Sequence, residues 1–168
     1  MKDTIVERIV HNVCGDIKKH WKVSPALVGV IDDQPLSVDE YEYPPNPLRA
    51  GWGESGLPFA FVYELEEVPN LGGTVAWNNT LNGQVQVFFR YSINEPDKRL
   101  APLGRSYRGE IKRALMLDHT RGGVAFRTVF GRNFVDTTPI DGIGAAVVDF
   151  EVQYFHNLKD PASRDTAH

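Results

Sequence analysis

The chain has 168 residues, of which 42% are apolar and 24% are charged, and eighteen Lys and Arg stand against twenty-two Asp and Glu for a net charge of −4. These proportions indicate one globular domain and exclude a disordered or fibrous chain; the acidic balance argues against a dedicated nucleic-acid binder. A single cysteine, Cys14, excludes an internal disulfide and a cysteine-based zinc site. No apolar run approaches the roughly 20 residues of a membrane helix, and the charged N-terminus lacks a signal-peptide core, so we expect a cytoplasmic protein without membrane contact.

The first predicted element is a helix from Thr4 to His20. Apolar residues recur there at spacings of three and four, which places them in one stripe along a helix. Thr4 and Glu7 fit a capping box, in which each side chain accepts a hydrogen bond from the other residue's backbone. The helix should therefore begin at Thr4.

Residues 30–57 are predicted to form a long loop, because Pro and Gly interrupt their second half repeatedly. The short apolar run from Ala26 to Ile31 fits a strand. Loops of this length in a compact domain are usually functional or ordered by a partner. Trp52 lies in the loop between two glycines, and so large an aromatic needs cover from its own core or from a neighbour.

Four segments alternate apolar and polar residues with the period of half-buried antiparallel strands. They are Phe59 to Val68, Gln84 to Ile93, Val124 to Asp136, and Ile143 to His156. In the first of them, the alternation places Glu64 and Glu66 together on the polar face. Between the second and third of them, a helix is predicted from about Arg105 to Asp118, ended by Gly122-Gly123.

This order of elements predicts a single α+β domain over residues 1–160, in which two helices flank one face of an antiparallel sheet. Residues 161–168 form a polar C-terminal tail. No internal repeat is visible.

Catalytic and metal-binding motifs were sought and none was found. The five histidines show no short ligand spacing with a carboxylate, and neither a nucleophile elbow nor a phosphate-binding glycine loop occurs. Asp118-His119 lies at a predicted helix end, where a capping role is the commoner one. We therefore expect no catalytic residue, no cofactor and no metal, and not an enzyme.

Charge is distributed unevenly along the chain. Residues 98–121 carry a net charge of +5, whereas residues 32–67 carry −8. Three interpretations remain open at this stage. In the first, both segments are solvated; in the second, they meet across a head-to-tail interface between copies. In the third, the basic helix contacts DNA. The third is weakened because the chain outside residues 98–121 carries a net charge of −9.

Four segments together carry a resemblance to a known family. They are the helix Thr4–His20, the proline-entered strand Gly56-Leu57-Pro58-Phe59-Ala60-Phe61-Val62, the passage from Val87-Phe88-Phe89-Arg90-Tyr91 to Gly109–Leu115, and the closing strand Val148–Pro161. In this pattern, which covers most of its length, the chain resembles the tail terminator (tail-completion) proteins of long-tailed bacteriophages. It exceeds the shorter members chiefly through residues 30–57.

The resemblance implies a homo-hexameric ring with an open lumen. One face of the ring would sit on the last ring of the tail-tube protein and the other on a head-side connector or neck protein, with the tail sheath as a further partner. Genomic DNA would pass through the lumen without specific binding. The protein would reside in the virion, at the tail or neck, and in the host cytoplasm during assembly.

Within such a ring, residues can be assigned to surfaces from their charge and position. The candidates for the subunit interface are Arg105, Arg108, Lys112 and Arg113 on the helix and Glu64, Glu66 and Glu67 on the first strand. Trp52 is the candidate for contact with an axial partner. Asp149 and Glu151 are candidates for an acidic lumen, which would not retain DNA. The alternatives are another neck, connector or minor tail protein and, in a different class, a small α+β enzyme or ligand-binding domain with a concave pocket.

Overall fold

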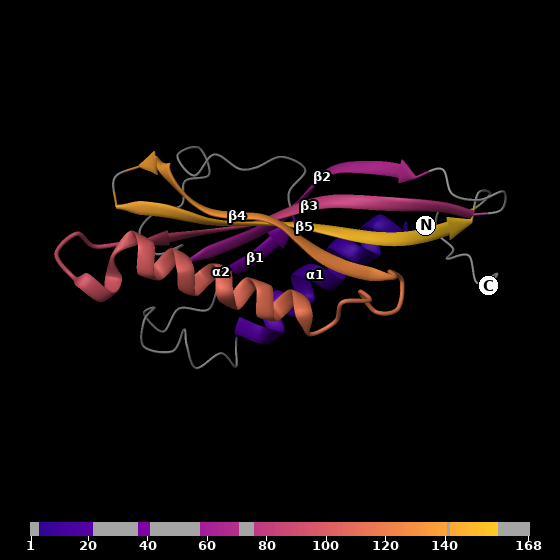
Figure 1. Ribbon diagram of the computed structural model, residues 1–168. Helices are drawn as coiled ribbons and strands as arrows, with labels where there is room; N and C mark the ends of the chain where they lie inside the picture. The colour runs from indigo at the N-terminus through magenta and orange to yellow at the C-terminus, as the bar shows by residue number, and fades with distance from the viewer. Residues whose placement is uncertain (1–3, 22–36, 41–57, 71–75, 141, 158–168) are drawn as a thin grey trace.

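The computed structural model describes residues 4–21, 37–40, 58–70, 76–140 and 142–157, which form helices on one side of a sheet (Figure 1). The helices are α1 (Ile5–Trp21) and α2 (Leu100–Met116), preceded by the short 3-10 helix η2 (Pro96–Lys98). The strands are β1 (Ser37–Glu40), β2 (Phe59–Asn70), β3 (Ala76–Arg90), β4 (Arg127–Ile140) and β5 (Ile143–Asn157).

The five strands form one sheet in the order β1-β2-β3-β5-β4. Strands β2, β3, β5 and β4 pair antiparallel, which confirms the α+β class with an antiparallel sheet. Strand β1 adds in parallel to the first four residues of β2. It lies inside the range predicted to be a loop, residues 30–57, and its sequence, SVDE, has no apolar alternation that would have predicted it.

Helix α1 follows its predicted bounds to within one residue. The capping box is present: the Thr4 backbone N–H donates to Glu7 Oε2 at 2.6 Å, and the Glu7 N–H donates to Thr4 Oγ1 at 3.2 Å. The backbone bond from Thr4, and after it a bond from the Thr4 hydroxyl to Glu7 Oε2 at 3.0 Å, lower the pKa of Glu7 below its usual value.

The predicted bounds of three elements were wrong. Strand β4 runs over Arg127–Ile140 rather than from Val124 to Asp136. Helix α2 begins at Leu100 rather than Arg105, because Pro102 lies in the first turn, where the missing N–H has no helical partner to lose. Strand β3 begins at Ala76 rather than Gln84 and ends at Arg90 rather than Ile93. Its polar first half pairs with β5 over every residue, so the neighbouring strand extends β3 beyond its apolar alternation.

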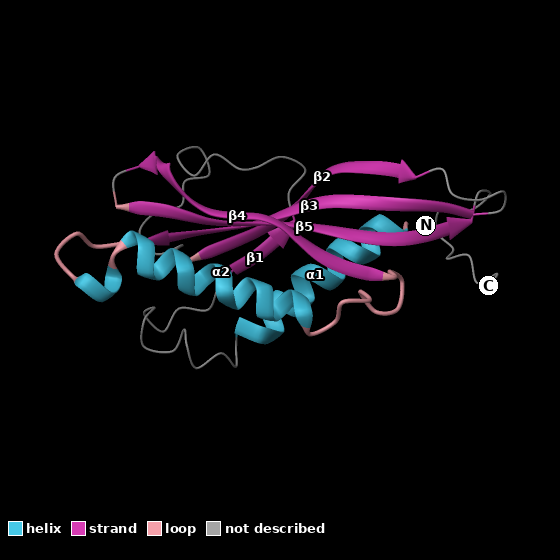
Figure 2. Cartoon of the chain, viewed as in Figure 1, coloured by secondary structure: helices cyan, strands magenta, loops and turns pink. Residues whose placement is uncertain are grey.

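Both helices pack on the same face of the sheet, as Figure 2 shows. Ile9 and Ile17 of α1, Ile111 of α2, and Val85 and Val148 of the sheet are all fully buried between the layers. This contact holds the domain together, since each such side chain removed from water stabilises the fold by about 1.5–3 kcal/mol.

The opposite, helix-free face carries a smaller apolar cluster. It contains Phe61, Tyr63, Phe88, Ala145 and Val147, all buried. The Phe61 ring stacks on Phe88 with centroids 5.5 Å apart and on Tyr63 at 5.6 Å. Apolar alternation in the strands therefore predicts only some of the buried side chains, because toward one end of the sheet side chains are buried on both faces.

Three predictions lie outside the described residues: the strand from Ala26 to Ile31, the contact role of Trp52, and the polar tail 161–168. Neither helix in the part of the chain that the structure describes is long and apolar enough to span a membrane.

Two glycines of α2 test the packing of this helix against β4. A Cβ placed on Gly104 would overlap the stiff Val135 side chain, with Cγ1 at 3.1 Å, whereas nothing lies within 4 Å of a Cβ on Gly109. We predict that Gly104→Ala lowers the free energy of unfolding by about 1–3 kcal/mol through overpacking. Gly109→Ala should instead raise it by about 0.5–1 kcal/mol, since alanine loses less chain entropy in a helix.

Urea denaturation of both variants checks the pair. Equal effects of the two substitutions would contradict the close approach of α2 to β4.

Candidate functional site

Most of the basic residues predicted on α2 serve contacts within the chain. Arg108 Nη1 donates to the Asn133 carbonyl oxygen of β4 at 3.1 Å and to Asn133 Oδ1 at 3.4 Å. Lys112 Nζ lies 5.8 Å from the centre of the Phe130 ring, also on β4. These two residues therefore fasten α2 along β4, while Arg105 is exposed on the outward side of the helix.

Arg113 belongs to an ion cluster between the two helices. It pairs with Glu110, which is 2% exposed, and Glu110 also contacts His20 of α1, Nε2 to Oε2 at 2.7 Å. Burying a carboxylate is costly unless it is paired, and the two partners meet that requirement. Sequence reasoning missed the cluster because ninety positions separate His20 from Glu110.

The three glutamates of β2 are exposed, as an interface would require, but they do not share one face. Glu64 pairs with Gly83 and Glu66 with Asn82, so a β-bulge inserts Leu65 between them. Residues opposite each other in a pair point to the same side, which puts Glu64 and Glu67 on the helix side and Glu66 on the helix-free side. The prediction that Glu64 and Glu66 lie on one face was therefore wrong.

The structure places the predicted basic and acidic sets far apart. Helix α2 packs against β4 and β5, whereas β2 lies beyond β3 in the sheet order. At about 4.8 Å per strand, β2 and β4 are about 14 Å apart. The predicted basic and acidic sets therefore do not pair with each other within one copy.

A chain of polar contacts crosses the helix-free face from β2 to β4. The Tyr63 hydroxyl contacts Gln84 and accepts from Gln86 Nε2 at 2.8 Å. Gln84 Nε2 donates to Asp149 Oδ1 at 2.5 Å, and Arg132 Nε lies 3.3 Å from Asp149 Oδ2. Burial, the larger cause, together with the Asp149 charge raises the pKa of Tyr63, so its hydroxyl stays protonated.

Asp149 and Glu151, the residues predicted to line a lumen, both lie on this helix-free face. Glu151 pairs with Asn82 and Val129 and is half-buried. The face is not uniformly acidic among the described residues, because Arg132 and Arg127 also project from it, Arg127 Nε bonding to Gln153 Oε1 at 2.8 Å.

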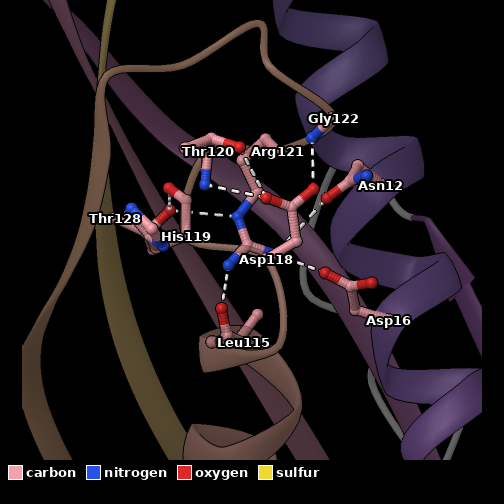
Figure 3. A network of polar contacts seen from close by, with 9 residues as sticks. All are labelled: Asn12, Asp16, Leu115, Asp118, His119, Thr120, Arg121, Gly122 and Thr128. Carbon is pink, nitrogen blue, oxygen red and sulfur yellow. Dashed lines mark hydrogen bonds and ion pairs between the residues drawn. The ribbon is translucent and has the colours of Figure 1, made fainter.

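A buried arginine joins the turn after α2 to α1 (Figure 3). Arg121 is 1% exposed and has φ +53°, a left-handed conformation that is unusual outside glycine. Its guanidinium donates to Asp16 Oδ2 at 2.8 Å, to Thr128 Oγ1 at 3.0 Å and to the Leu115 carbonyl oxygen. Thr128 Oγ1 in turn donates to the His119 carbonyl oxygen at 2.9 Å, which ties the turn to β4.

The Asp118 carboxylate closes the same turn. Oδ1 accepts from the Thr120 backbone N–H at 2.9 Å and from Thr120 Oγ1 at 2.7 Å, and Oδ2 accepts from the Gly122 N–H. Partial burial raises the pKa of Asp118, but these bonds together outweigh burial and hold the pKa below its usual value. Asp118 thus closes the turn that follows α2 rather than capping the helix, and His119 is exposed and contributes its backbone carbonyl.

The described residues contain no group of three His, Cys, Asp or Glu side chains placed to hold a metal ion. An open hollow of about 540 Å³ lies beside α1, bordered by Arg8, His11, Gly15, Lys19 and Gly122 among others.

No protein-family model matches the chain, and no curated protein matches it. Among solved structures, a chain from "Virion of native gene transfer agent (GTA) particle" is similar at 10% sequence identity and a TM-score of 0.38. The match covers 83% of this chain and 92% of that chain.

The Arg121 contacts predict a large loss of stability on their removal. In Arg121→Met, Asp16 keeps a partly buried carboxylate without its guanidinium, and burial already raises the pKa of that group. We expect the free energy of unfolding to fall by about 3–5 kcal/mol, as for other broken buried pairs. Arg105→Met, which changes an exposed arginine, should stay within about 0.5 kcal/mol of wild type. Equal urea midpoints for the two variants would contradict the structural role of Arg121.

Asp118 predicts a pH-dependent effect in the same turn. A carboxyl whose pKa is lower in the folded than in the unfolded state adds stability above its unfolded pKa, near 3.8, and loses it as the pH falls through the folded pKa. Asp118→Asn should therefore be less stable than wild type at pH 7, with the difference shrinking below about pH 4. Thermal unfolding of both proteins from pH 7 to pH 3 measures this; a pH-independent gap would contradict the role of the charge.

Proposed function

We propose that the protein is a structural subunit of a phage-like virion that closes the end of a tail tube and joins it to a head-side connector as a closed ring, most simply of six copies. The observation that carries the proposal is the separation of opposite charges onto opposite sides of one domain. Exposed Glu64, Glu66 and Glu67 lie at the β2 side, and Arg105 and Lys112 lie at the α2–β4 side. Unlike surfaces on two sides of a subunit favour head-to-tail contacts, and such contacts close into a ring when the rotation between neighbouring copies allows it.

The layered fold supports a ring with a defined inside. If the two sides of the domain contact neighbours, the helix layer and the helix-free face remain to form the outer wall and the lumen. We assign the helix-free face to the lumen, which would place Asp149 and Glu151 there as the sequence predicted. The cross-strand contacts of Asp149 with Gln84 and Arg132 would stiffen that wall.

The remaining partners of the proposal follow from the resemblance in sequence pattern. The ring would contact the tail-tube protein on one side and a neck protein on the other, with the tail sheath as a further partner and Trp52 as the candidate residue for an axial contact. It would act without catalysis and without a cofactor, and DNA would pass through its lumen.

Electron microscopy of the purified chain, alone and mixed with tail tubes from the particle that it belongs to, tests this function. We predict rings with a central hole and, in the mixture, one ring at one end of each tube. Particles produced without the chain should show tails separated from heads. Binding along the whole length of the tube, or intact head–tail joints without the chain, would contradict the proposed role.

A further inference from the structure

We infer that the bulged edge of β2 in one copy docks alongside the outer edge of β4 in a second copy, with Leu65 as its apolar contact and with Glu66–Arg127 and Glu64–Lys112 as its ion pairs. This inference rests on the ring of the proposed function and names the surfaces that would form it. The partner is therefore a second copy of this chain.

Both edges are open among the described residues. Strand β1 pairs only with Phe59–Val62, so no described strand covers the outer edge of β2 beyond Val62. Strand β4 is last in the sheet order and has β5 on one side only. Because β2 and β4 run antiparallel to each other within the sheet, shifting a copy sideways brings its β4 edge beside β2 in antiparallel orientation.

The strand register shows which residues would then meet on the helix-free face. One row runs Glu66–Asn82–Glu151–Val129 across the four strands. In a copy shifted sideways, Glu66 would face Val129 of the next copy, with Arg127 as its diagonal neighbour. Diagonal pairs lie about 7–8 Å apart, within reach of long side chains. Arg127 and Glu66 are both exposed on that face, so they complement each other in position as well as charge.

The next row gives a second pair on the helix side. It runs Glu64–Gly83–Phe150–Phe130, and the Lys112 ammonium group lies over the Phe130 ring. Glu64 of one copy would therefore face Lys112 of the next. The ion pairs fall on both faces of the sheet because the bulge at Leu65 puts Glu64 and Glu66 on opposite sides.

Exposed apolar residues accompany these charges on both edges. Leu65, the extra residue of the bulge, is 52% exposed, and Phe126, which directly precedes β4, is 60% exposed. The β4 edge is also bulged at this level, between Phe130 and Asn133. Bulges interrupt a backbone ladder, so side chains rather than a continuous sheet would carry the contact.

A mixing experiment tests the ion pair. Glu66→Arg would repel Arg127 and Arg127→Glu would repel Glu66, so each variant alone should associate about tenfold or more weakly than wild type. In an equimolar mixture, copies that alternate around an even-membered ring restore opposite charges at every contact. The mixture should therefore recover the wild-type mass in light scattering across protein and salt concentration. The control pair Glu95→Arg and Lys98→Glu changes two exposed charges in the segment before α2, outside β2 and β4, and should associate like wild type, alone and mixed.

Leu65→Ser tests the apolar contact, with Ile93→Ser as its matched control. Ile93 is 79% exposed outside both edges, so only the Leu65 change should weaken association, again by about tenfold. Three results would overturn the contact. The first is that the single charge reversals associate like wild type, and the second is that their mixture associates as weakly as either variant alone. The third is that the wild-type chain is monomeric at every concentration. Tail-tube binding in the same samples distinguishes failure of this contact from failure of the proposed function. If the chain forms a ring that binds no tail tube, the function is contradicted and the contact stands. If the chain is a monomer that binds tail tubes, the contact is contradicted and the role at the tail tube stands.

Discussion

The packing of both helices against a single face of the sheet is the constraint on which the other features depend. Ile9, Ile17, Ile111 and Val148 lose all contact with solvent in that layer, so α1 and α2 cannot move to the other face without exposing the core. Because the layer is one-sided, the second face and the two edges of the sheet are left to differ in chemistry. A subunit with four unlike sides is suited to a directional assembly, whereas one with equivalent sides would pair with itself about a two-fold axis.

Charged residues in this chain serve two different purposes, and their burial separates them. Arg121 and Glu110 are 1% and 2% exposed, and both are paired across elements that lie far apart in sequence. Their contacts fasten the turn after α2 and the far end of α1. The exposed charges of β2 and β4 make fewer contacts within the chain, and they carry the argument for a neighbour. The basic segment at residues 98–121 therefore contains both residues that bond within the chain, such as Arg108, and exposed residues, such as Arg105.

Periodicity in the sequence predicted the helices and the four antiparallel strands, because each has a continuous apolar side that the core requires. It did not predict β1, which has no such side, nor the early start of β3, which depends on pairing with β5. The alternation rule failed at Leu65, since one inserted residue reverses the facing of everything after it. Arg121 left no sequence signal, although Asp118, Thr120 and Gly122-Gly123 around it have the composition of a turn. The sequence therefore offered candidate residues by type alone, and their interface role stays a prediction; their division between two faces and two edges required the register.

The central claim is that unlike edges of neighbouring copies meet in a closed, directional ring. End-on electron microscopy of the unmodified chain at a concentration where light scattering shows full assembly tests this claim most directly. The account predicts a ring of six copies, with the β2 edge of every subunit beside the β4 edge of the next. A two-fold dimer with like edges together, or a monomer under all conditions, would contradict it.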